Sequence, residues 1–430
     1  RIALACGSLL MAAGTSAQQT QVAPKAATAP TQSVVVTGIR GSLETSLSLK
    51  RDAQGWVDGI TAEDIGKFPD TNLAESLQRI SGVSIDRSIG EGSRITVRGA
   101  GPDHNLVLLN GRQMPASSIA DTAASASRAF DFANLASESI AALEVYKTSR
   151  ASTPTGGIGA TVNIKTAKPL ETRGMLASVG IKGVVDRSNS RLPDPIQGSN
   201  ITPEISGIYS NTFADGKFGV AISGSYQERD LGYNQAAVPG GWRAFAGDEN
   251  NWGTIPQPGT PGSENITNRP KASDLYSVPQ NLNYSVNGLK RQRTNGQLTL
   301  QFAPFKGLTA TLDHTYSENK IQTKRHELSA WFNFGPSVSS WTDGPVAAPK
   351  FYAETIVPPT SDIAMAGAAF GTRNLNRSTG VNIAWKASDR LRLELDAHSS
   401  TATSGADSPY GSNASLGTAS FNRGTTSVDF

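Results

Sequence analysis

Cysteine is nearly absent from the 430-residue sequence. The one cysteine, Cys6, lies in the N-terminal apolar run, so the chain after that run forms neither disulfides nor cysteine-based metal sites. The histidines are scattered without the spacing of a metal-binding motif, and we expect no metal site. Beyond the N-terminus no apolar run reaches the roughly 18 residues of a transmembrane helix. A membrane role would therefore have to use strands.

Charged residues are also scarce, at 17%, and the net charge is +3. No basic stripe accompanies a known nucleic-acid-binding module, so we expect no nucleic-acid partner. Sequence motifs of catalytic sites are missing too. For example, no serine lies in a G-x-S-x-G motif. The run from Gly156 to Gly159 lacks the lysine of a P-loop and precedes an expected strand rather than a helix. We therefore expect neither enzyme activity nor a cofactor.

The N-terminal residues predict an export signal followed by a flexible segment. Residues 2–13 are apolar and are followed by small residues, which predicts a signal peptide over residues 1–17. Residues 18–32 are rich in Ala, Thr, Pro and Gln and predict a disordered linker.

The first ordered segment predicted after the linker is a short strand over residues 33–40. Its centre consists of Val34, Val35, Val36, Thr37 and Gly38, in which stiff valines favour a strand and the glycine ends it. After a flexible linker, such a strand can pair with the sheet edge of another protein. An edge strand of the following domain is the alternative.

Residues 41–169 predict a compact α+β domain. Alternating or apolar runs indicate strands at residues 95–97, 106–109, 139–147 and 161–165. A helix is expected between a cap at Asp70 or Thr71 and a stop at Gly82.

From residue 175 onward the sequence predicts amphipathic strands of about ten residues, the length with which a tilted strand crosses a bilayer. In residues 391–396, Leu alternates with Arg, Glu and Asp, which predicts one face for lipid and one for a wet lumen. The connections alternate between short and long, as in outer-membrane barrels. A soluble β-sandwich would show the same strand pattern but has no reason for this loop alternation. The expected strands are 175–185, 201–211, 217–229, 291–304, 308–325, 374–386, 390–403 and 417–429, and the short connections are 212–216, 305–307 and 387–389.

The motifs across residues 34–166 together resemble the plug domain of TonB-dependent outer-membrane receptors. They are VVVTGIR, NLAESLQRISGV, ITVRG, NLVLLNGRQMP and IAALEVYKTSRASTPTGGIGATVNIKT. The resemblance implies an α+β plug inside an antiparallel transmembrane β-barrel of about 22 strands in the cell outer membrane. It also implies that residues 34–38 are the TonB box, which a periplasm-spanning energy-coupling protein grips. The segment EDIGKFPDTNLAESLQRISGV resembles the corresponding segment of proteobacterial receptors that scavenge carbohydrates.

Residues 175–430 supply only about the first eight strands of such a barrel. The interior of an eight-stranded barrel is filled by its own side chains, so it cannot hold a plug. We therefore expect the chain to be an N-terminal fragment of a monomeric receptor that contacts outer-membrane lipid.

Candidate ligand-binding residues lie at the plug apex and in the long loops. Aromatic faces can stack on sugar rings, and neighbouring polar groups can bind hydroxyls. Packing within the loops is the alternative for each ring. The candidates are Asp103, His104, Arg112, Asp121, Trp242, Trp252, Trp331 and Trp341.

The resulting hypothesis is energy-coupled import of a scarce solute, with an oligosaccharide as the first choice. An iron chelate (siderophore) or a cobalamin-type solute is the alternative. Two alternatives belong to other classes: a non-transporting surface adhesin and an exported carbohydrate-binding enzyme.

Overall fold

The computed structural model describes residues 47–53, 55–61, 72–88, 90–116, 119–120, 123–124, 127–135, 137, 140–151, 153–171, 174–335, 337–409 and 415–430. The predicted signal peptide, linker and TonB box lie outside the described residues, and so does Asp121. All described residues belong to one compact unit, Gly38–Phe430. Among them, no helix is both long and apolar enough to cross a bilayer.

Residues 47–169 form a small domain, called the plug below. Its main sheet has five strands in the order β1-β8-β9-β4-β5, with β4 and β9 parallel and the other pairs antiparallel. Two further hairpins, β2–β3 and β6–β7, belong to the same domain. The strands are β1 (Val57–Thr61), β2 (Val83–Ser88), β3 (Glu91–Val97), β4 (Asn105–Leu109), β5 (Arg112–Gln113), β6 (Ile119–Ala120), β7 (Ala123–Ala124), β8 (Ile140–Tyr146) and β9 (Ala160–Thr166).

Helix α3 (Leu73–Leu77) packs against the hairpin β2–β3. The Oδ1 atom of Asn72 accepts from the backbone N–H of the second and third helical residues at 3.0 and 3.3 Å. The cap is therefore Asn72, and the prediction of Asp70 or Thr71 was wrong by one or two residues. Leu73 and Leu77 are fully buried in an apolar core that also contains β3, β4, β8 and β9 side chains. The predicted α+β domain is confirmed.

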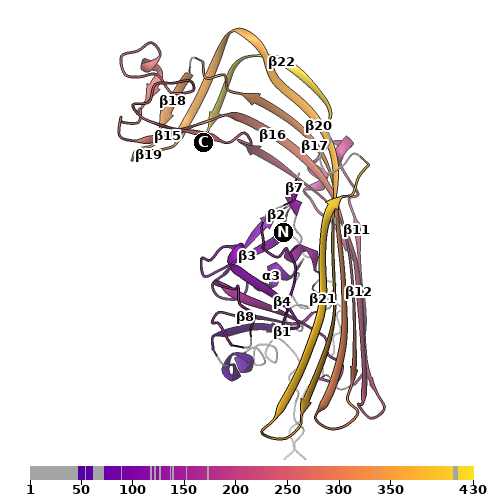
Figure 1. Cartoon of the computed structure of the whole chain (residues 1–430). Helices are drawn as coiled ribbons and strands as arrows, with labels where there is room; N and C mark the ends of the chain where they lie inside the picture. Colours follow the sequence, from indigo (N-terminus) through magenta and orange to yellow (C-terminus); the bar gives the residue numbers. More distant parts are fainter. Residues whose placement is uncertain are drawn as a thin grey trace, which may run out of the picture. The chain divides into compact units, whose positions relative to one another are not determined.

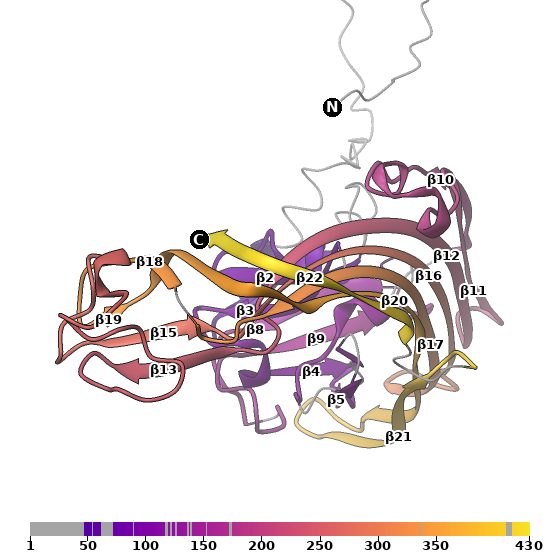
Figure 2. The same ribbon diagram turned by 90° about the horizontal axis from the view of Figure 1, so that it is seen from above.

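The rest of the chain builds a ten-stranded sheet that curves beside the plug (Figures 1 and 2). Seven of its strands are antiparallel neighbours and are called the wall below. The wall consists of β10 (Leu176–Val184), β11 (Thr202–Phe213), β12 (Phe218–Ala237), β16 (Asn281–Phe302), β17 (Leu308–Trp331), β20 (Pro349–Lys386) and β21 (Arg392–Ala406). The antiparallel strand fold predicted from the alternation is confirmed.

The short connections lie where the sequence predicts them, after β11, β16 and β20. In the first of them Ala214, Asp215 and Gly216 all have positive φ, which makes the tight reversal. The other ends of the strands differ from the prediction. Strands β12, β16 and β17 have 20, 22 and 24 residues, about twice what a bilayer crossing needs. Much of the sequence predicted as long loops is therefore strand that continues beyond the membrane.

Strand β22 (Ser415–Asp429) corrects the expectation of an eighth crossing strand. It pairs with Phe351–Ala368, the outer half of β20, whereas β21 pairs with the inner half, Thr372–Lys386. Alternation predicts a strand but not its partner, so this pairing cannot be predicted from the pattern.

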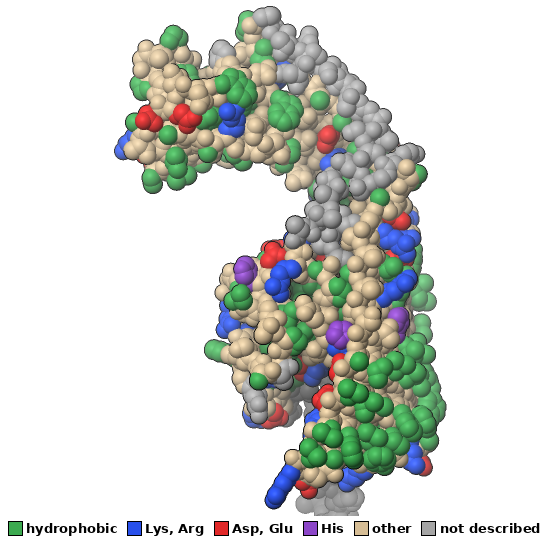
Figure 3. Space-filling model, in the orientation of Figure 1, with side chains coloured by type: hydrophobic (Ala, Val, Ile, Leu, Met, Phe, Trp, Pro, Cys, Tyr) green, Lys and Arg blue, Asp and Glu red, His purple; other side chains and the backbone are tan. Residues whose placement is uncertain are grey.

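The two faces of the wall differ in polarity. Register places Phe213 opposite Phe218 and Phe218 opposite Phe302, and all three are substantially exposed on the outer face. Figure 3 shows hydrophobic side chains gathered over this end of the wall. The inner face carries buried polar side chains, as predicted for a wet lumen. The other exposed outer residues include Ile222, Leu300, Leu312, Ile383, Trp385, Leu393 and Leu395.

The long connections at the other end of the strands fold together around a separate apolar core and are called the external body below. Strands β13 (Trp242–Ala246), β15 (Leu275–Pro279) and β19 (Val346–Ala347) form a three-stranded sheet. Strand β18 (Ser337–Trp341) pairs with β20, and β14 (Ile266–Thr267) with β18. An ion pair of 3.0 Å between Arg423 and Glu354 is completely buried there. The core residues are Phe245, Ile255, Tyr276, Val278, Phe332, Trp341, Ala347 and Tyr352.

Candidate functional site

One buried carboxylate of the plug meets three arginines of the wall. Glu91, at the start of β3, is 4% exposed. Its Oε1 lies 3.0 Å from Arg229 Nη1 on β12, and its Oε2 lies 2.7 Å from Arg291 Nη1 and 2.8 Å from Arg293 Nη2 on β16. Arg229 also contacts Asp186 at 2.7 Å. Arg291 and Arg293 are two residues apart on one strand, so both point to the inner face.

The arginines keep Glu91 ionised. Burial alone would raise the pKa of Glu91, but the charges of Arg291, Arg293 and Arg229 outweigh it and hold this pKa far below its ordinary value. Asp131 of the plug behaves in the opposite way, because burial raises its pKa. Glu91 is therefore the plug carboxylate whose charge the wall stabilises.

A second ion-pair cluster has the reverse polarity. Arg112 on β5 is 5% exposed, and its Nη1 lies 2.6 Å from Asp313 Oδ2 on β17. Its Nε and Nη2 donate to the two oxygens of Asp396 on β21 at 2.8 and 2.9 Å, a bidentate pair. A Cβ atom on Gly380 of β20 would lie 1.7 Å from Arg112 Nη1. The guanidinium thus lies against the backbone of Gly380, where no side chain blocks its path to Asp313 and Asp396.

A third contact is uncharged. Asn134 ends the 3-10 turn η2 (Phe132–Asn134) of the plug. Its main-chain carbonyl accepts from Ser317 Oγ, and its Oδ1 accepts from Asn319 Nδ2 at 3.2 Å. Both partners lie on β17 of the wall. Together the three contacts tie the plug to β12, β16, β17 and β21.

These contacts are polar, whereas the plug core is apolar. A hydrogen bond or ion pair between plug and wall can be exchanged for bonds to water at modest net cost. Separating the two surfaces would therefore expose little of the apolar core. The described contacts thus hold the plug against the wall through polar groups.

The plug residues predicted to bind ligand have different environments. Asp103 is exposed and accepts from Ser127 Oγ and from the backbone N–H of Arg128 and Ala129 at 2.9 and 3.2 Å. The hydrogen bond from Ser127 lowers the pKa of Asp103. His104 is exposed beside it. Arg112 is not available to a ligand, because it is buried between two wall carboxylates.

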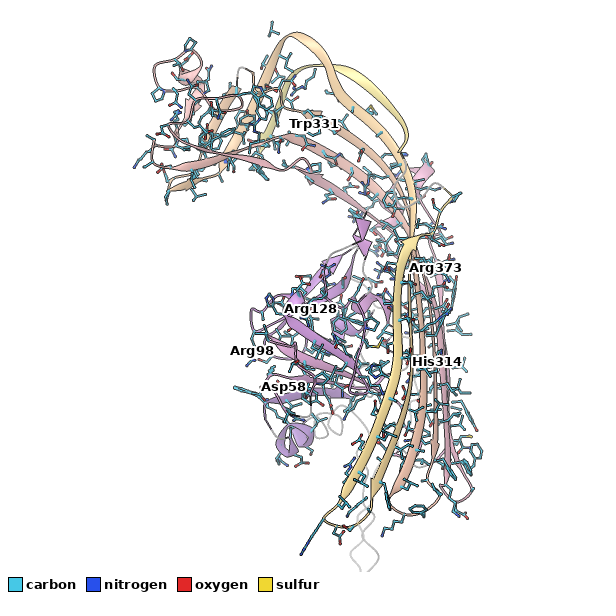
Figure 4. All side chains as sticks on the ribbon, viewed as in Figure 1. Asp58, Arg98, Arg128, His314, Trp331 and Arg373 are labelled. Atoms are coloured by element: carbon cyan, nitrogen blue, oxygen red, sulfur yellow. The ribbon has the colours of Figure 1, made fainter. Side chains whose placement is uncertain are left out.

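The four tryptophans predicted to bind ligand also differ in exposure. Trp341 is 1% exposed, so its ring is part of the external core and is closed to a ligand. Trp252 is 66% exposed, with the Arg243 guanidinium 4.3 Å from its ring centroid. Trp242 and Trp331 are also about half exposed. Figure 4 shows Trp331 on the external strands and Arg128 on the plug. Three of the four rings therefore remain available on the external body.

Sequence reasoning missed Glu91 and its three arginines. The sequence carries one signal for them: Arg291 and Arg293 flank Gln292 in a strand whose other inward positions are all uncharged. Two adjacent inward cations predict an anion on whatever faces them. Nothing local marks Glu91 as that anion.

Comparisons with known proteins agree with this geometry. Residues 49–161 match the family model "TonB-dependent Receptor Plug Domain". Over 214 residues the chain is 29% identical to the vitamin B12 transporter BtuB of Vibrio cholerae, which covers 49% of this chain and 30% of the relative. The chain thus corresponds to less than a third of the length of that curated relative.

Two solved receptor structures align with most of the chain at low TM-scores. The siderophore receptor PirA from Acinetobacter baumannii has a TM-score of 0.35 at 15% identity, covering 84% of this chain and 59% of PirA. The alcaligin receptor FauA from Bordetella pertussis has a TM-score of 0.31 at 12% identity, covering 88% and 59%.

The fold and the plug–wall contacts define a plug-and-barrel protein of the cell outer membrane. More particularly, residues 49–161 match the plug domain of TonB-dependent receptors, and antiparallel strands follow them in the chain. The relative named above, BtuB, is a transporter.

Replacing Glu91→Gln in the full-length receptor should loosen the plug. The buried Arg291 and Arg293 and the partly exposed Arg229 would lose this counter-charge, at a cost of about 3 kcal/mol. Hydrogen exchange of β3 amides should then be roughly 100-fold faster. Glu171→Gln, on an exposed residue, is the control and should change nothing. Equal exchange in both variants would contradict the role of Glu91.

The same contact predicts a pH dependence. The pKa of Glu91 is lowered by folding, so its stabilisation is complete above the unfolded pKa of about 4.3 and is lost only as the pH falls further. The protection factors of the β3 amides, which are exchange rates corrected for the intrinsic effect of pH on exchange, should therefore be the same at pH 7 and pH 5.5.

Gly380→Ala should displace Arg112. The added methyl would occupy the position of the guanidinium, and overpacking of this kind costs about 1–3 kcal/mol. Gly405→Ala on β21 is the matched control, because a Cβ there meets nothing within 4 Å. We expect faster protease cleavage of the plug in the first variant only. Identical cleavage rates would show that Arg112 does not hold the plug.

Proposed function

We propose that this chain is part of a receptor that imports a scarce solute across the outer membrane, using energy from a TonB-type protein. The observation that carries the proposal is the set of buried polar contacts between plug and wall. A plug held by Glu91 and Arg112 blocks the lumen at rest. It must rearrange before a solute can pass, and a polar interface permits this.

The energy would enter through residues 34–38. This valine-rich segment has the composition of a strand that can add to the sheet edge of a partner. Binding of the solute outside would release the segment into the periplasm, a change from order to disorder. The coupling protein would then pull on it, and the force would reach the plug contacts.

For the solute, a cobalamin-type compound or an iron chelate is the leading candidate. The curated relative is a vitamin B12 transporter. On the external body, Arg243 lies against the rings of Trp252, Phe245 and Phe334, with centroid distances of 4.3–5.4 Å. Flat conjugated or anionic groups bind well to such a combination of rings and cation.

An oligosaccharide is the second candidate. The exposed rings of Trp242 and Trp331 offer faces on which a sugar can stack. The resemblance of EDIGKFPDTNLAESLQRISGV to carbohydrate-scavenging receptors also favours this class.

Deleting residues 34–37 from the full-length gene tests the coupling. Uptake of labelled cyanocobalamin, a ferric siderophore and a maltooligosaccharide would be measured in cells that express the receptor. We expect accumulation of one of the first two, and a loss of at least about tenfold in the deletion variant. Binding to the cell surface should be unchanged, because the external body is intact.

Deletion of residues 26–29 in the predicted linker is the matched control and should retain uptake. Undiminished uptake without residues 34–37, at normal abundance, would refute the coupling. Accumulation of none of the three solutes by the wild type would favour the adhesin, and hydrolysis of the sugar by purified receptor would favour the enzyme.

A further inference from the structure

The outer face of the wall changes character along each strand. Near the short turns it carries the rings of Phe218, Phe302 and Trp385. Eight residues further along β12 and β20, the outward positions are Tyr226 and Arg377. Eight strand residues span about 27 Å, or roughly 20 Å along the membrane normal at a 45° tilt. The apolar band of such barrels is about 25 Å tall, so its outer edge lies near this level.

Just beyond that edge, the outward positions of β16, β17 and β20 hold a group of cations. Figure 3 shows Lys and Arg side chains next to the hydrophobic area. Register places Lys290 opposite Gln322, and Lys320 opposite Arg373, on the same face. The cations are Lys290, Lys320, Lys324, Arg373 and Arg377.

The acids of this surface do not neutralise all of these cations. Glu228 pairs with Lys290 at 2.7 Å, and Glu318 pairs with Arg373. The remaining acid, Asp230, accepts from the backbone N–H of Ser199 at 2.7 Å. Among the residues that the structure describes, Lys320, Lys324 and Arg377 have no ion pair. The surface therefore carries excess positive charge at the edge of the lipid-facing band.

A concave site lies within this surface. The segment that leads to β11 folds back over β16 and β17, and Lys324 Nζ lies 3.5 Å from the carbonyl oxygen of Pro195. A cavity of about 440 Å³ remains beneath the segment. Its lining includes Gly198, Ser199, Asp230, Lys290, Gln322 and Lys324.

We propose that this surface binds the phosphate groups of an outer-leaflet glycolipid, with Lys320 and Lys324 as its main anion-binding residues. Lysine ammonium groups bind phosphate as compact point charges. The acyl chains of the same molecule would lie on the apolar band directly below. Continuity with that band favours a lipid over a free anion, which would gain nothing from the apolar neighbour.

The test compares the full-length receptor with its Lys320→Gln/Lys324→Gln variant. Lys217→Gln/Lys306→Gln is the matched control, because it removes two exposed lysines at the opposite, short-turn end of the wall. Each protein is titrated in phosphatidylcholine nanodiscs with bis-phosphorylated lipid A, and separately with lipid A that lacks both phosphates. Lipid bound per receptor is counted by native mass spectrometry.

We expect the wild type and the control to retain phosphorylated lipid A with equal affinity. The Lys320/Lys324 variant should bind it about 25-fold more weakly, roughly fivefold for each lysine. All three proteins should bind the dephosphorylated lipid equally weakly.

Three results would overturn the proposal. One is equal binding of phosphorylated lipid A by wild type and variant, provided that the variant shows the normal heat-dependent shift on gel electrophoresis. Another is tight binding of the dephosphorylated lipid. The third is displacement of the lipid by 10 mM inorganic phosphate, which would show that the site takes a free anion.

Discussion

The contact between Glu91 and Arg229, Arg291 and Arg293 is the constraint on which the rest of the structure depends. A carboxylate that is 4% exposed is tolerable only if its charge is matched. The matching charges come from strands about 140 and 200 residues later in the chain. The charge of Glu91 is therefore balanced only when the wall is in place. The buried arginines of the wall are in turn balanced only when the plug is in place.

The second cluster fixes the orientation of the plug relative to the wall. Glu91 presents a plug anion to wall cations, and Arg112 presents a plug cation to wall anions. A plug that turned or slid along the wall would bring like charges together. The two clusters thus specify one position of the plug on the wall, and the uncharged contact of Asn134 with β17 adds a third point of attachment.

Sequence patterns predicted what is local. The alternation in residues 391–396 correctly put Asp396 on the inner face, and the short connection predicted at residues 212–216 does join two strands, through a positive-φ turn. They could not predict that β22 pairs with the outer half of β20, because alternation carries no information about a partner. They also placed Trp341 and Arg112 among ligand residues, since an aromatic or charged residue in a loop looks the same whether it packs or binds. Burial separates these cases, and burial depends on residues far away in the sequence.

The external body and the plug have different kinds of stability. The body has an apolar core around Tyr276 and Trp341 and a buried pair of Arg423 with Glu354, so it is expected to keep its shape. The boundary of the plug is polar and can be hydrated. The proposed import would use both properties: the solute would bind to the rigid external body while the plug rearranges beneath it. The division between rigid body and releasable plug follows from where the apolar residues lie.

The most direct test of this account is to lock the plug to the wall. Asn134→Cys and Ser317→Cys would introduce a cysteine pair at a position where the native residues are already in contact. With the disulfide formed, uptake of the receptor's solute should stop while its binding at the surface persists, and a reductant should restore uptake. Uptake at the wild-type rate with the disulfide intact would show that the plug need not leave the wall, and it would contradict the account.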